Sequence, residues 1–162
     1  MKRILTVLFA FGLFSCNRPE DNTTVLQNRI DSLENKLAKT YKPGMGEFMS
    51  DIQAHHLKLW FAGQNQNWKL ADFEVSQITG TIEDIKNYQA QQKESKMMGM
   101  IRPALDSINN AIQQKNPVLF KSSYALLTNA CNNCHRTTNV EFNVVITPET
   151  QPFSNQDFKT NK

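Results

Sequence analysis

Glycine, proline and strand-like runs are all scarce in this chain. Its 162 residues include six glycines and six prolines, and alternating or β-branched apolar stretches are few. All-β folds need many short strands separated by turn residues. The scarcity of both features indicates a mainly helical fold.

Charge of one sign is not concentrated anywhere either. Eighteen Lys and Arg stand against 15 Asp and Glu, a net charge of +3. Lys2 and Arg3 lie in a segment that we expect to be removed, which leaves 16 basic against 15 acidic side chains. The clustered basic face of a nucleic-acid binder is missing. A hydrophobic content of 40% suits one folded domain with appendages.

The first fifteen residues have the order of a secretory signal. A short positive region precedes an apolar run from Ile4 to Phe14, which is too short to span a bilayer but suits the core of a signal peptide. Leu13-Phe14-Ser15-Cys16 resembles the lipobox of bacterial lipoproteins. The resemblance implies cleavage before Cys16 and its acylation, hence a bacterial cell-envelope protein facing the periplasm or the exterior. An ordinary signal peptide, or an uncleaved anchor, is the alternative.

Residues 16–44 are expected to form a lipidated tether with a short helix. Leu26, Ile30, Leu33 and Leu37 repeat at helical spacing in one apolar stripe. The stripe covers fewer than three heptads, which is marginal for a coiled coil. A helix that packs on the domain or spaces it from the membrane is therefore favoured over a self-association stalk, and a homo-oligomer stays open.

Residues 45–136 carry four amphipathic helical patterns with short connections. The first runs from about Gly46 to Ala62 and is expected to end at Gly63 as a C-cap. Asn67 and Asn116-Pro117 are suited to begin the second and fourth helices, and Pro103 the first turn of the third. The apolar stripes are Met45, Met49, Ile52, His56 and Leu59; Ala71, Val75, Ile78, Ile82 and Ile85; Ile101, Leu105, Ile108 and Ile112; and Phe120, Tyr124, Leu127, Cys131 and Cys134. The pattern predicts an all-α, antiparallel up-down four-helix bundle.

Residues 137–162 change character. Val140, Phe142, Val144 and Ile146 alternate with other residues, which indicates an extended segment. A lone strand is not stable by itself. We therefore expect this C-terminal tail to lie along the bundle.

The chemistry is carried by Cys131-Asn132-Asn133-Cys134-His135, the C-x-x-C-H signature of c-type haem attachment. Two cysteines at i and i+3 share one helix face, where each sulfur can bond one vinyl group of the same porphyrin. His135 is then held beneath the iron as an axial ligand. The motif predicts one covalently attached haem c for each chain.

Three different roles for the two cysteines fit the sequence less well. A thioredoxin-like dithiol is expected beside a βαβ pattern, which is absent. A structural zinc site needs about four ligands, and the chain has no second cysteine pair. A disulfide does not account for His135. The cysteine count closes with one residue for lipid and two for haem, and the export signal agrees with haem attachment outside the cytoplasm.

The motif closes the last helix of the expected bundle, whereas small cytochromes c carry it near the N-terminus. Over about Gly46 to Arg136 this arrangement resembles the cytochrome c-prime family and its Met/His-ligated relatives. In those relatives the sixth iron ligand is a Met near the start of the first helix, a position that Met49 matches. The rivals are His56, Met45, and an open sixth position as in the c-prime proteins. A flexible core side chain is the ordinary role of such a Met.

Several neighbours complete the expected site. Phe48, Ile52 and Trp60 are candidate pocket walls, although plain core is the commoner role of each, and Arg136 is a candidate partner of a haem propionate. We expect single-electron transfer between redox partner proteins, because a dry bundle tunes the potential through ligand and burial. A five-coordinate haem that binds a gas such as NO or CO is the alternative, and a lipoprotein scaffold with an accessory haem is a third. An enzyme is not expected.

Overall fold

The computed structural model describes residues 22–40, 42–151 and 153–160, and the chain divides into two compact units between Tyr41 and Lys42. The signal segment and Cys16 lie outside the described residues. The described regular structure is all helical. The scarcity of strand-forming runs therefore predicted the fold class correctly.

In the first unit, α2 covers Asn22–Ala38. Its apolar stripe is exposed: Leu26, Ile30, Leu33 and Leu37 keep between 47% and 66% of their surface accessible. The placement of this unit relative to the second is not determined.

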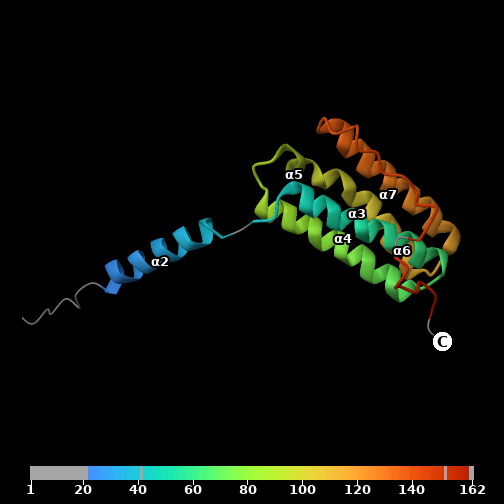
Figure 1. The fold of residues 1–162 in the computed structure, drawn as a ribbon, viewed down its shortest axis with the longest axis horizontal. Helices are drawn as coiled ribbons and strands as arrows, with labels where there is room; N and C mark the ends of the chain where they lie inside the picture. The colour runs from blue at the N-terminus through green and yellow to red at the C-terminus, as the bar shows by residue number, and fades with distance from the viewer. Residues whose placement is uncertain (1–21, 41, 152, 161–162) are drawn as a thin grey trace, which may run out of the picture. The chain divides into compact units, whose positions relative to one another are not determined.

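The second unit contains four long helices that lie side by side (Figure 1). These are α3 (Met45–Gln64), α4 (Trp68–Tyr88), α6 (Arg102–Gln113) and α7 (Pro117–Thr137), with the short α5 (Lys93–Met97) and a 3-10 helix η1 (Met98–Ile101) before α6. Helix α3 packs against α4 and α7, and α6 packs against α4 and α7. The sequence patterns did not predict α5 or η1.

The expected helix starts are confirmed. The Asn67 side chain accepts a hydrogen bond from the Leu70 amide, and Asn116 accepts from the amides of Val118 and Leu119. Each asparagine satisfies amides that have no partner inside the helix. Pro103 stands in the first turn of α6, where its missing N–H costs nothing.

The expected end of the first helix is wrong. Gly63 lies inside α3, which continues to Gln64, and the left-handed residue that follows is Gln66 at φ 53°. Gly63 has another role, because a Cβ built on it would overlap the ring of Phe120 on α7. A glycine here allows close helix packing and does not cap the helix.

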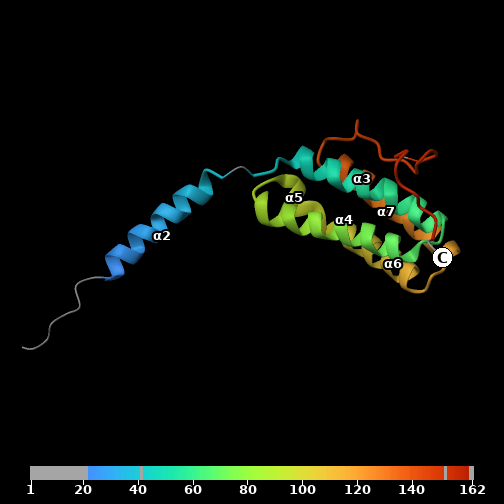
Figure 2. The same ribbon diagram turned by 60° about the horizontal axis from the view of Figure 1, so that its bottom comes forward.

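The core is built from the predicted stripes. Leu59, Ile78, Ile85, Ile108, Phe120 and Tyr124 are all buried. The C-terminal segment leaves α7 and runs back beside α3 (Figure 2). No strand forms among its described residues, and Phe142, Val144 and Ile146 are 84%, 65% and 68% exposed. Their alternation does not mark a buried face, while Phe158 near the end is fully buried against Phe61.

Candidate cofactor site

The last two turns of α7 bring the three motif side chains to one place. Cys134 is buried, and Cys131 and His135 are half-buried. All three line a pocket of about 170 Å³, whose other walls come from α3, η1 and the C-terminal segment. The spacing of the motif therefore does place both sulfurs at the edge of a common space.

A second pocket of about 250 Å³ adjoins the first. The two share Met49 and Gly46 on α3, Met98 on η1, Cys134 and His135 on α7, and Asn143. Each is smaller than a typical cofactor pocket of about 300–1,000 Å³. A porphyrin would therefore need the space of both pockets.

The ring of His135 is oriented by the C-terminal segment. Its Nδ1 donates a hydrogen bond of 2.6 Å to the backbone oxygen of Asn143. A carbonyl can only accept, so Nδ1 carries the proton and Nε2 is the nitrogen with a lone pair. A hydrogen bond from the second ring nitrogen to a carbonyl is typical of metal-ligating histidines and raises the basicity of the ligand nitrogen.

Asn132, inside the motif, joins α7 to the same segment. Its Nδ2 donates to the Val145 oxygen and its Oδ1 accepts from the Val145 amide, each at 2.8 Å. No sequence pattern pointed to this contact, because the two middle positions of C-x-x-C-H can hold any residue.

Burial disfavours the thiolate form of both cysteines. Burial, with a smaller contribution from the nearby Cys134, raises the pKa of Cys131 to about 11. Burial and then the charge of Glu94 also raise the pKa of Cys134. Redox-active dithiols depend on a lowered pKa, so this pair does not have the electrostatics of a thioredoxin-like site.

The candidate sulfur ligands lie around the same two pockets. Met49 lines both of them, and Met45 lines only the second. Met98, which the sequence reasoning missed because it lies in the unpredicted 3-10 helix, is buried and lines both. The structure thus surrounds the motif with thioether groups from two elements.

His56 also borders the first pocket, but both of its ring nitrogens are engaged. Nε2 contacts the Thr128 hydroxyl at 3.0 Å and Nδ1 contacts the Tyr124 hydroxyl at 2.9 Å. Since Thr128 donates its own proton to the Tyr124 carbonyl, it accepts from Nε2–H. Burial lowers the pKa of His56 to about 4. This is a satisfied, neutral core histidine.

The remaining predicted residues are spread out. Ile52 lines the first pocket, whereas Phe48 packs against Tyr88, and Trp60 packs against Tyr124 with ring centroids 4.7 Å apart. Neither Phe48 nor Trp60 lines either pocket. Arg136 is exposed and donates to the side chain of Asn133.

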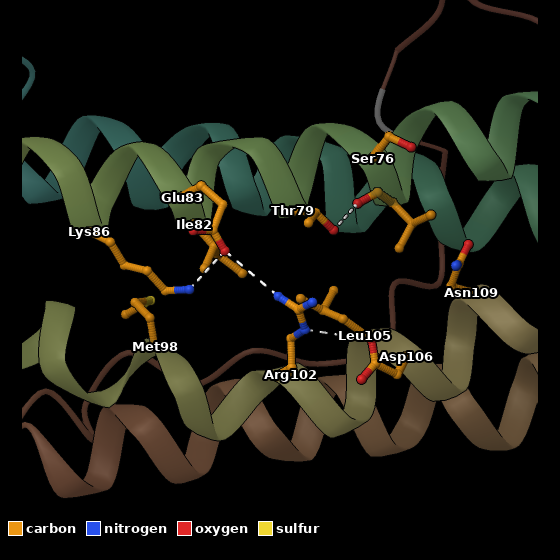
Figure 3. Close-up of a pocket in the computed structure, with 11 residues that line it drawn as sticks. Ser76, Thr79, Ile82, Glu83, Lys86, Met98, Arg102, Leu105, Asp106 and Asn109 are labelled. Carbon is orange, nitrogen blue, oxygen red and sulfur yellow. Dashed lines mark hydrogen bonds and ion pairs between the residues drawn. The ribbon is translucent and has the colours of Figure 1, made fainter.

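A further pocket of about 340 Å³ lies between α4 and α6 (Figure 3). Its charged groups are already paired: Glu83 contacts Lys86 at 2.7 Å and Arg102 at 3.8 Å, and Arg102 contacts Asp106 at 3.7 Å. These exposed pairs are weak. The pocket does not include the motif residues, although Met98 borders it as well.

The donor set fits a thioether-linked haem. Two cysteine side chains and one imidazole with Nδ1 engaged meet at pockets walled by Ile52, Ile101 and methionines. Among the described residues, no group of three or more His, Cys, Asp or Glu side chains could hold a bare metal ion. No helix in the described part of the chain could cross a membrane. Comparisons with family models, curated proteins and solved structures found no match.

Proposed function

We propose that this chain is a mono-haem c-type cytochrome that transfers single electrons. The observation that carries the proposal is the C-x-x-C-H motif on α7, with both cysteines and His135 bordering one pocket and the His135 ring oriented through Nδ1. Cys131 and Cys134 would hold the haem by thioethers, and His135 would supply Nε2 to the iron. When bound, the haem supplies a one-electron couple whose potential depends on ligands and burial.

The chain's own residues have separate roles in this proposal. Addition of each cysteine S–H across a vinyl C=C of the haem would form one thioether, with no net oxidation. Ile52 and Ile101, which line the first pocket, would help to exclude water from a bound haem, and the Asn143 carbonyl holds the His135 proton at Nδ1. Met49, which borders both pockets, is the proposed sixth ligand.

We further propose that α3, α4, α6 and α7 form the up-down bundle of the cytochrome c-prime type. The contacts of α3 and α6 with both α4 and α7 support this order. Lipidation of Cys16 would hold the protein on a membrane surface of a bacterial envelope, where redox partner proteins can reach it.

The first test is the mass of the full chain made in a host that matures c-type cytochromes. We expect the purified protein to carry the added mass of one haem that survives denaturation. The double variant Cys131→Ala/Cys134→Ala should lose it, because both thioether bonds are gone. A wild-type mass without the macrocycle would overturn the proposal.

The sixth ligand is tested by adding carbon monoxide to the reduced protein. With Met49 bound, wild type should show a low-spin spectrum and bind the gas slowly, whereas Met49→Ala should become high-spin and bind it readily. Met45→Ala, one helical turn earlier and on the second pocket only, is the matched control. A high-spin wild type that binds carbon monoxide at once would instead favour the gas-binding alternative.

A further inference from the structure

Residues 142–146, in the first part of the C-terminal segment, are held on α7 mainly by polar contacts. Both backbone groups of Val145 are paired by one side chain, that of Asn132, at 2.8 Å each. The two lie thirteen positions apart in sequence, so these bonds close a loop that contains Cys134, His135 and Asn143.

Apolar burial contributes little to this attachment. Phe142, Val144 and Ile146 flank the clamped residue, yet each is at least 65% exposed. A side chain that stays in water gains almost no hydrophobic stabilisation, whereas each internal hydrogen bond stabilises modestly. The Asn132 pair is therefore a main attachment of this stretch.

The clamp lies two residues from the carbonyl that receives the His135 proton. Asn143 accepts from His135 Nδ1 at 2.6 Å, and its own amide donates to the Val140 oxygen at 2.9 Å. Moving Val145 away from α7 would therefore also move the Asn143 carbonyl. The orientation of the His135 ring depends on a segment that Asn132 holds in place.

We propose that Asn132 is a positioning residue for the iron ligand: it fixes the C-terminal segment so that Asn143 sets the tautomer and direction of the His135 ring. This inference rests on the proposed haem function and deepens it. Hydrogen bonding from Nδ1 makes Nε2 a stronger donor, which favours ferric over ferrous iron. The chain would thus tune its reduction potential through a middle residue of its own attachment motif.

The test compares Asn132→Ala with Asn133→Ala in the full, matured protein. Asn133 is the other middle residue of the motif and is exposed, and the side-chain hydrogen bond that the structure gives it is to Arg136. Two readouts are taken: hydrogen exchange of the Val145 amide and the His135 ring N–H by NMR, and the midpoint potential of the haem.

We expect Asn132→Ala to speed both exchange rates about tenfold or more. The potential should rise, with the ferric-to-ferrous stability ratio falling up to about tenfold, or about 59 mV for one electron. Asn133→Ala should match wild type in both readouts.

An unchanged potential in Asn132→Ala, or an equal shift in Asn133→Ala, would overturn the inference. Failure of the proposed function is seen separately, as a wild-type chain without attached haem. In that case the exchange rate of the His135 ring proton still tests the role of Asn132. Protection in Asn132→Ala equal to that in wild type would refute the positioning role.

Discussion

The two histidines that border the first pocket differ in what their ring nitrogens can do. His135 has Nδ1 directed to a backbone carbonyl, which defines Nε2 as the ligand nitrogen. His56 places both nitrogens on hydroxyl groups, and the single Tyr124 hydroxyl proton is shared between His56 Nδ1 and the His56 backbone oxygen, each 2.9 Å away. Ligation by His56 would break this buried network, and leaving its partners unsatisfied costs about 1–3 kcal/mol each. The difference favours Met49 over His56 as sixth ligand.

The burial of His56 also predicts how the stability of the fold depends on pH. Its folded pKa of about 4 lies below the ordinary value of 6.5, so between these values the unfolded chain binds a proton that the folded chain does not. Stability is therefore fully present above pH 6.5 and falls as the pH drops to 4, by about 3 kcal/mol.

Urea unfolding of wild type and His56→Gln across this range checks it. Gln cannot be protonated, so the variant should start less stable at pH 7.5 and lose about 3 kcal/mol less on acidification. If the free energies of unfolding of the two proteins fell in parallel as the pH drops, His56 would not be the source of this pH dependence.

At the scale of elements, the contact between α3 and α7 depends on Gly63, a residue without a side chain. The buried Gly63 faces the ring of Phe120, which also packs against Trp60, Trp68 and Tyr124. A ring held on several sides cannot move aside without disturbing its neighbours.

Alanine substitutions at two glycines should therefore change the free energy of unfolding in opposite directions. Gly63→Ala should lower the free energy of unfolding by about 1–2 kcal/mol, because overpacking outweighs the gain in helix propensity. Gly80→Ala on α4 is the matched control, with no atom within 4 Å of its new Cβ, and should gain about 0.5–1 kcal/mol. Thermal unfolding measures the stability of both variants. A Gly63→Ala protein more stable than wild type would contradict this prediction and show that the Phe120 ring can move aside.

At the scale of the whole molecule, the two units have different means of support. The second unit has a continuous core from Phe48 to Phe158. An isolated helix of the length of α2 is marginal in water, and the leucine and isoleucine side chains of its stripe are exposed. Within its own unit, α2 therefore gains little stabilisation from apolar burial.

The prediction at this scale concerns how the protein is attached to a membrane. If Cys16 is acylated, wild type should sediment with membranes and resist extraction by salt, because acyl chains bind through buried CH₂ groups and not through charge. Cys16→Ser should release the protein to the soluble envelope fraction with its haem retained. Membrane retention of Cys16→Ser would point to an uncleaved apolar anchor instead.

The sequence alone determined the helical class, the starts at Asn67, Asn116 and Pro103, and the motif on the last helix. These features are local: period, capping and spacing act within a few residues. The tertiary structure decided what long-range contacts control. Gly63 allows close packing against Phe120, and Trp60 and Phe48 pack against aromatic side chains and do not line the pockets. Met98 and Asn143 line both pockets beside the motif. None of these has a sequence signature, because each depends on segments that meet only after the chain folds.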